Sequence, residues 1–155
     1  GATLLLLVLM LIGGCGGSTS GGVKQSRLLL LIKYSRERVQ RVMFPHAIAN
    51  VRLNGNRIGA DTMHKALTFF FLYIVVLMVI SLAMAVIECT DSMTAISAVV
   101  TCQGNVGPGL GGVGATQTYY WLSAPGKLLL TFAMLLGRLE LFTVLVVLLP
   151  SFWRE

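Results

Sequence analysis

The sequence predicts an all-α integral membrane fold in which spanning helices alternate with short helices that end inside the membrane. Hydrophobic residues make up 55% of the 155 positions and the mean hydropathy is +0.81. A soluble domain of this size could not bury so much apolar surface. One apolar run, residues 66–87, is long enough to cross a bilayer, and two shorter runs are each followed by a glycine-rich stretch.

The clearest span is residues 66–87, ALTFFFLYIVVLMVISLAMAVI, which lies between Lys65 and Glu88 and carries no charge. As a helix this run is about 33 Å long, and the hydrocarbon core of a bilayer is about 30 Å thick. We therefore expect a single helix that crosses the membrane.

Basic residues concentrate before this span. Residues 24–65 carry nine Lys or Arg against two Asp or Glu, within a net charge of +6 for the chain. Basic residues beside a span stay on the cytoplasmic side, which predicts that residues 36–65 lie inside and Glu88 outside. We expect contacts with anionic membrane lipids. We expect no nucleic acid, because aromatic residues are not interleaved with these charges.

The second half continues with a run too short to span, residues 93–102, and then TCQGNVGPGLGG at residues 101–112. A helix that enters the membrane and stops halfway is tolerated only where protein surrounds it or it lines a cavity. The aromatic residues of QTYYW, 117–121, are typical of a membrane interface. Residues 126–149 then predict a helix that returns to the cytoplasm.

The first part of the chain repeats this plan. Residues 3–12 form a short apolar run, 13–22 read GGCGGSTSGG, and a helix is expected over 23–42. Only residues 28–32 of this helix are continuously apolar, and Arg27 and Lys33 stand on either side of them. Because a charge at the bilayer centre costs roughly 2.5 to 3.5 kcal/mol, we expect other helices to shield this segment and a water-filled path beside it.

A short helix followed by a glycine-rich return loop is typical of an ion selectivity filter. The C-terminal end of the helix carries partial negative charge that stabilises a cation, and successive carbonyl oxygens replace the water shell of the ion. Glycine adopts the backbone angles that such carbonyls need. No ring of acidic side chains accompanies the loops, which favours a weakly hydrated monovalent ion. A filter needs about four such loops, so we expect two more to come from outside this chain. We expect the chain to be the C-terminal part of a larger protein.

Four motifs in order resemble the C-terminal half of TrkH-type potassium-uptake proteins of the Trk/Ktr/HKT superfamily. They are GGCGGSTSGGVK at 13–24, GNVGPGLG at 104–111, MLLGRLELF at 134–142 and PSFWRE at 150–155. The resemblance covers essentially the whole chain. It implies four potassium-channel-like helix–pore-loop–helix repeats in one subunit.

The resemblance divides the chain into three parts. Residues 1–42 would hold the pore helix, filter loop and second helix of repeat three, 43–65 a basic cytoplasmic connection, and 66–155 the whole of repeat four. The implied function is potassium uptake by a multi-pass protein of the cytoplasmic (inner) membrane, with potassium as transported substrate, no cofactor and no enzymatic activity. The implied partners are a second copy in a homodimer and a cytoplasmic nucleotide-binding ring of the TrkA type that controls opening.

The resemblance also assigns site residues. The potassium-binding filter would comprise Thr19, Ser20, Gly21, Asn105, Val106 and Gly107. The family often has glycine where this chain has Ser20, whose carbonyl would serve equally. A serine that replaces the glycine matched by Gly21 or Gly107 is associated with sodium entry, and because both glycines are intact the resemblance favours potassium.

Two further sets of basic residues are candidates. The family places the arginine matched by Arg138 close beneath the filter, which implies a positive gate that opposes cation passage. The alternative for Arg138 is a structural ion pair, for which Glu140 is poorly placed because it is only two positions away. We expect Arg36, Arg38 and Arg41 to contact the regulatory ring, because they are basic and cytoplasmic.

Three alternatives remain open at this point: an ion-coupled secondary transporter of another solute, a sodium-permeable member of the same superfamily, and a non-transporting membrane scaffold. Secondary transporters also use broken helices but are expected to carry an intramembrane carboxylate, for which Glu140 is the candidate. The three cysteines have neither CxxC spacing nor a neighbouring histidine, so we expect no disulfide and no metal other than potassium.

Overall fold

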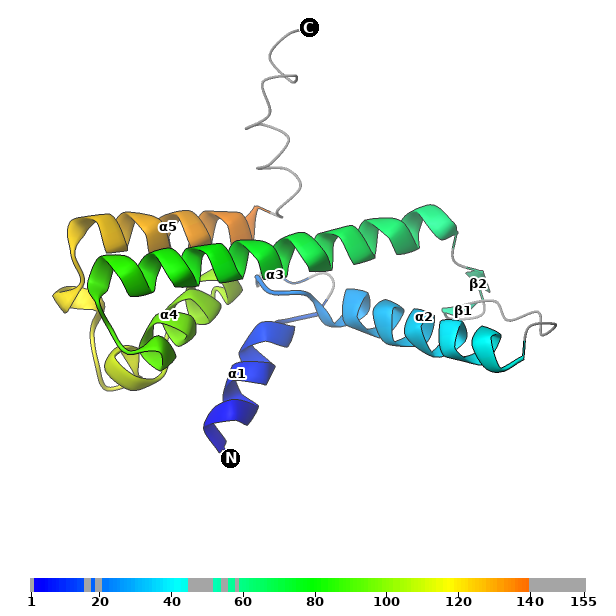
Figure 1. Cartoon of the computed structure of the whole chain (residues 1–155), viewed down its shortest axis with the longest axis horizontal. Helices are drawn as coiled ribbons and strands as arrows, with labels where there is room; N and C mark the ends of the chain where they lie inside the picture. The colour runs from blue at the N-terminus through cyan, green and yellow to red at the C-terminus, as the bar shows by residue number, and fades with distance from the viewer. Residues whose placement is uncertain are drawn as a thin grey trace, which may run out of the picture.

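The computed structural model describes residues 2–15, 18, 21–44, 52–53, 56–57 and 59–139. Five α-helices account for most of these residues, which confirms the predicted all-α class. One long helix, α3 (Ala60–Glu88), extends through the molecule; α5 (Ala124–Arg138) lies along its C-terminal half and α2 (Gln25–Met43) along its N-terminal half (Figure 1). The exception to the helical class is a two-residue antiparallel pair, β1 (Arg52–Leu53) with β2 (Asn56–Arg57).

Helix α3 contains the predicted span and extends it at the N-terminal end. Among the described residues it is the one helix long and apolar enough to cross a membrane, with a mean hydropathy of 2.9 over its apolar part, of which 28% is buried. The core helix of a soluble protein would be mostly buried, so this exposure supports a membrane helix. Its buried face follows helical spacing and includes Phe69, Tyr73, Leu77, Ile80 and Met84.

Both short helices are also confirmed. Helix α1 (Ala2–Ile12) has 11 residues and α4 (Ser92–Gly104) has 13. At 1.5 Å per residue, α4 is about 20 Å long and cannot cross a bilayer. It is also the most enclosed helix of the described chain, since it contacts α1, α3 and α5 and buries ten of its residues. A half-helix inside a membrane needs such surroundings.

The helix predicted over residues 23–42 forms as α2, which begins at Gln25. Arg27, in the first turn of α2, is shielded by another helix, as expected, because its guanidinium lies 4.0 Å from the centroid of the Phe69 ring on α3. Lys33, two turns further on, is exposed. The water-filled path expected beside this helix stays a prediction.

The C-terminal end of α3 and the N-terminal end of α5 are tied together. Ser123 caps α5, and its backbone N–H and hydroxyl both donate to the Glu88 carboxylate at the end of α3. Gly126 follows within the first turn, where a Cβ atom would overlap the same carboxylate. A carboxylate at a helix N-terminus is favourable because it faces the unpaired N–H groups there.

The expectation of one unbroken helix over residues 126–149 is wrong. Helix α5 ends at Arg138, with Leu139 as its C-cap, and the part from residue 140 lies outside the described residues. Gly137, in the last turn, is a weak helix former, which favours an end to the helix here. The Asn105 side-chain amide also donates to the Met134 carbonyl at 3.4 Å and so joins the end of α5 to the loop after α4.

Candidate functional site

The chain reverses direction at the C-terminal end of α4. Asn105 is in the left-handed conformation (φ 54°, ψ 40°), and its N–H donates to the Cys102 carbonyl at 3.1 Å. The next N–H, from Val106, donates to the Thr101 carbonyl at 2.9 Å. Asparagine tolerates this conformation better than most residues, so it ends the helix sharply. The loop then begins where the partial negative charge of α4 is greatest.

Three hydroxyl groups on one face of α4 hold the returning loop. The Thr101 hydroxyl donates to the Pro108 carbonyl at 3.1 Å. One turn earlier, the Ser97 hydroxyl donates to the Leu110 carbonyl at 3.0 Å and accepts the Leu110 N–H at 3.1 Å. These hydroxyls, with that of Thr94, which accepts the Gly112 N–H at 3.3 Å, form what we call the hydroxyl ladder.

The aromatic segment η2 (Tyr119–Trp121) holds the other side of the loop. The Tyr119 hydroxyl donates to the Gly107 carbonyl at 3.0 Å, and the Trp121 indole N–H donates to the Gly112 carbonyl at 3.1 Å. Sequence reasoning assigned these aromatic residues to the membrane interface only. Their hydrogen bonds to the Gly107 and Gly112 carbonyls hold two further positions of the loop backbone.

These bonds leave a short stretch of free carbonyl groups. The carbonyls of Gly107, Pro108, Leu110 and Gly112 each accept a hydrogen bond. No hydrogen bond from any described residue reaches the carbonyls of Asn105 and Val106, the first two loop positions. Oxygens of this kind at the C-terminal end of a half-helix could coordinate a cation.

Gly107 meets a conformational requirement. Its φ angle is +110°, which residues with a Cβ rarely adopt, and a Cβ placed there would find no atom within 4 Å. The requirement therefore arises from the backbone and not from crowding. Asn105, Val106 and Gly107 thus form the sharp end of the loop, with Val106 and Gly107 exposed.

The two predicted filter loops meet. A Cβ added at Gly21, in the first loop, would lie 2.5 Å from the Gln103 carbonyl oxygen and 2.8 Å from the Asn105 side-chain nitrogen. Gly104 in turn faces the Met10 carbonyl near the end of α1. The structure therefore brings Gly21 beside the second loop. Thr19 and Ser20 lie outside the described residues.

The end of α5 lies against the same place. A Cβ at Gly137 would overlap the Gln103 carbonyl oxygen, so glycine permits a backbone approach here that no other residue could make. Gln103 is fully buried, and its side-chain amide donates to the Tyr73 carbonyl of α3 at 3.4 Å. Arg138 follows Gly137 directly and is exposed. The candidate gate residue, Arg138, therefore directly follows the residue of α5 that approaches the end of α4, where the loop begins.

The candidate partner-contact residues lie on α2, away from the loops (Figure 1). Arg36 is exposed. Arg38 is exposed and donates to the Tyr34 hydroxyl at 2.9 and 2.8 Å. Arg41 belongs to the last turn of the same helix. Among the described residues, no group of His, Cys, Asp or Glu could hold a metal ion, and the described cysteines form no disulfide.

Sequence reasoning missed the hydroxyl ladder and Tyr119. A signal for the ladder was present, because Thr94, Ser97 and Thr101 follow the spacing of three and four that places residues on one helix face. Tyr119 had no such signal, since its bond to Gly107 spans 12 residues of irregular chain.

Together, one helix long enough to span, two short helices of which α4 is enclosed, and glycine-rich segments after both are typical of a helical membrane protein of the ion-transport class. The chain belongs to the TrkH family of cation transport proteins, whose family model matches residues 1–154.

Individual proteins similar to this chain carry the same family name. The Trk system potassium uptake protein TrkH of Escherichia coli strain K12 is 38% identical over 152 residues, which are 98% of this chain and 31% of that protein. The protein of the same name from Halomonas elongata is 39% identical over 97% of this chain. The crystal structure of the potassium transporter TrkH from Vibrio parahaemolyticus superposes with a TM-score of 0.88 at 36% identity, covering 98% of this chain and 32% of that one. The chain thus spans about a third of the length of these relatives.

Proposed function

We propose that this chain forms two of the four sides of a potassium-uptake pore in a larger TrkH-type protein. One observation carries the proposal: the loop after α4 begins with the Asn105 and Val106 carbonyls, which accept no hydrogen bond from any described residue, and Gly21 of the first loop lies against the side chain of the same Asn105. Carbonyl oxygens fixed by the surrounding protein suit a cation that gives up its water shell easily, and potassium is such an ion.

The filter comprises the residues that the family resemblance assigns, with different roles among them. Asn105 and Val106 provide carbonyl oxygens for the ion. Gly107 provides the backbone conformation, and its own carbonyl is held by Tyr119. Gly21 provides the close approach of the two loops, and Thr19 and Ser20 complete the first loop. The relatives are named as potassium uptake proteins or a potassium transporter, which supports potassium as the substrate.

Arg138 acts as a positive gate in this proposal. It follows the residue of α5 that touches the base of the second loop, so its charge lies close to the path of an ion that leaves the filter. A cation passing a fixed positive charge in a poorly hydrated region meets an electrostatic barrier.

The remaining proposals concern assembly. The whole protein forms a homodimer in the inner membrane, and Arg36, Arg38 and Arg41 on α2 contact a nucleotide-binding ring of the TrkA type. The name "Trk system", carried by the relatives, supports a multi-component assembly.

Complementation of a potassium-uptake-deficient bacterium with the full-length protein that contains this chain tests the function. We expect growth at low potassium to be restored, together with rubidium uptake into the cells. Growth that is restored only by another solute would identify a secondary transporter instead. Wild-type expression in the membrane without any rescue or uptake would identify a scaffold.

A further inference from the structure

Three segments of the chain meet in the last turn of α4, around the carbonyl oxygen of Gln103. A Cβ atom built on Gly21, in the first loop, would lie 2.5 Å from this oxygen, and a Cβ atom built on Gly137, in the last turn of α5, would overlap it. Only glycine permits both contacts, and backbone lies directly against backbone. We call this meeting of Gly21, Gln103 and Gly137 the loop junction.

The side chain of Asn105 lies in the loop junction as well. Its amide nitrogen would be 2.8 Å from a Cβ atom on Gly21 and 3.1 Å from a Cβ atom on Gly137. The same nitrogen donates a hydrogen bond of 3.4 Å to the Met134 carbonyl of α5. The backbone carbonyl of Asn105 accepts no hydrogen bond from any described residue and is one of the two that we assign to the ion. One residue therefore connects the proposed ion site with the end of α5.

The loop junction has little freedom on the α4 side. Gln103 is fully buried, and its side-chain amide donates to the Tyr73 carbonyl of α3 at 3.4 Å. The whole of α4 is enclosed by α1, α3 and α5. Closely packed contacts of this kind transmit a displacement, because they contain no space that could absorb it. A shift of the α5 end must therefore move the Asn105 amide or break its bond to Met134.

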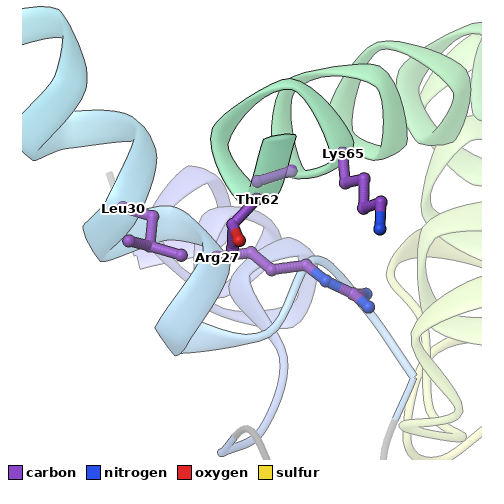
Figure 2. Close-up of a pocket in the computed structure, with 5 residues that line it drawn as sticks. Arg27, Leu30, Thr62 and Lys65 are labelled. Atoms are coloured by element: carbon purple, nitrogen blue, oxygen red, sulfur yellow. The ribbon is translucent and has the colours of Figure 1, made fainter. Parts of the chain in front are cut away.

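The contact between α2 and α3 differs in this respect. A pocket of about 490 Å³ lies between these two helices and is lined by Arg27, Leu30, Thr62, Lys65 and Ala66 (Figure 2). A substitution that adds volume to this lining meets open space, whereas a methyl group added at Gly137 meets backbone. The pocket therefore supplies a control for the loop junction.

The end of α5 that forms the loop junction also carries the proposed gate. Arg138 follows Gly137 directly, and Met134 lies about one turn earlier on the same helix. A movement that takes the Arg138 charge out of the ion path therefore also moves the two groups of α5 that contact Asn105. This connection rests on the proposed function, since it takes residues 105–107 as the filter and Arg138 as the gate.

We propose that Gly137 and the Asn105 side chain are positioning residues that couple the gate to the selectivity filter. While the end of α5 stays in place, the Asn105 amide is bound to it and the Asn105 carbonyl keeps its position for the ion. When the end of α5 moves, the bond is lost and the first filter carbonyl is released. Coupling between two sites is reciprocal, so a change at Asn105 also alters how readily the gate opens.

Asn105→Gly tests the coupling in the full-length protein, with competitive uptake of rubidium and sodium into cells as the measurement. Glycine readily adopts the left-handed conformation of this position, so the variant keeps the end of α4 and removes only the amide contacts. We expect rubidium over sodium discrimination to fall at least threefold. Basal rubidium uptake, normalised to the amount of protein in the membrane, should rise at least twofold.

A double variant separates coupling from a local effect on the filter. Because Arg138→Ala removes the gate, Asn105→Gly should raise rubidium uptake in the wild-type background and not in the Arg138→Ala background. An equal effect of Asn105→Gly in both backgrounds would overturn the coupling and leave the filter and gate assignments intact. Arg138→Ala without any rise in uptake would refute the gate, and the coupling with it.

Gly137→Ala approaches the loop junction from α5. The added methyl group displaces the end of the helix, so discrimination should fall at least threefold although residue 137 lies outside the filter. Ala66→Val adds volume beside the pocket between α2 and α3 and should leave discrimination unchanged. If Gly137→Ala does not reach the membrane in folded form, Asn105→Gly and its double variant decide the question. Wild-type discrimination in either folded variant of the loop junction would overturn the proposal.

Discussion

The hydroxyl of Tyr119 donates a hydrogen bond of 3.0 Å to the carbonyl oxygen of Gly107. The bond joins the aromatic segment η2 to a loop glycine whose φ angle, +110°, is one that other residues rarely adopt, and which has open space around it. The geometry of the candidate filter therefore depends on groups that do not themselves face the ion.

Removal of the Tyr119 hydroxyl tests this dependence. In Tyr119→Phe the Gly107 peptide loses a bond worth on the order of 1 kcal/mol, and we expect potassium over sodium discrimination to fall by about fivefold to tenfold. The measurement is competitive uptake of rubidium against sodium by the full-length protein. Tyr120→Phe is the matched control, because its side chain is 88% exposed and its hydroxyl forms no bond among the described residues. Equal discrimination in both variants would contradict the role of Tyr119.

Gly107→Ser tests the backbone requirement. A serine forced to a positive φ angle costs on the order of 1 to 3 kcal/mol, so we expect the peptide to rotate and potassium over sodium discrimination to fall about tenfold or more. The uptake assay is the same. Gly59→Ser serves as control, since Gly59 also has no atom within 4 Å of a built Cβ but has an ordinary φ of −65°. Unaltered ion ratios in Gly107→Ser would remove residues 105–107 from the filter.

Thr101→Val tests the hydroxyl ladder. The variant keeps the shape of the fully buried Thr101 side chain but removes its partly buried hydrogen bond to the Pro108 carbonyl. We expect a loss of about 1 to 3 kcal/mol in the stability of the loop, seen as a lower midpoint of thermal unfolding in detergent and weaker protection by added potassium. Thr68→Val, on an exposed position of α3, should change neither quantity. If Thr101→Val and Thr68→Val had the same midpoint and the same protection by potassium, the Thr101 bond would not stabilise the loop.

Arg138→Ala tests the gate. Loss of the positive charge lowers the barrier to cations, so basal rubidium uptake by the full-length protein without its regulatory partner should rise severalfold. Arg138→Lys keeps the charge and should stay near the wild-type rate. If both variants instead lowered uptake along with the amount of folded protein, a structural ion pair would be the better account of Arg138.

The basic surface of α2 is the subject of the last prediction. With Arg36, Arg38 and Arg41 changed together to Ala, copurification of the regulatory ring should fall at least tenfold at physiological salt, because exposed charge pairs contribute additively to association. Unchanged rubidium uptake in the absence of the ring would show that the variant folds. Retention of the ring at the wild-type level would place its contact elsewhere.

The features predicted best from sequence are those that depend on local composition. The uncharged run before Glu88 became α3, and the two short apolar runs became α1 and α4, because length and hydropathy alone decide whether a helix can span. The end of α5 at Arg138 was missed because it depends on contacts from residues far away in sequence: Gln103 against Gly137, and Asn105 on Met134.

The candidate site was predictable in part for the same reason. Asn105, Val106 and Gly107 follow directly from the end of a short helix and a glycine-rich motif. The meeting of Gly21 with Gln103 and Asn105, and the bond from Tyr119, join segments that no local pattern connects. Only the packing of the helices reveals which loop carbonyls remain free.

The hydrogen bonds from Ser123 to Glu88 join the two ends of the 34-residue segment between them. These residues include α4, and because α4 is itself packed against α1, α3 and α5, a change in an exposed turn beyond it should leave α4 in place. Ala115 and Thr116 are exposed in this segment. An insertion that doubled the length of the loop at this point would cost only about 0.6 kcal/mol of loop-closure entropy. A short peptide tag or a fluorophore placed at that point could follow the outer mouth of the protein in living cells while the ion path remains undisturbed.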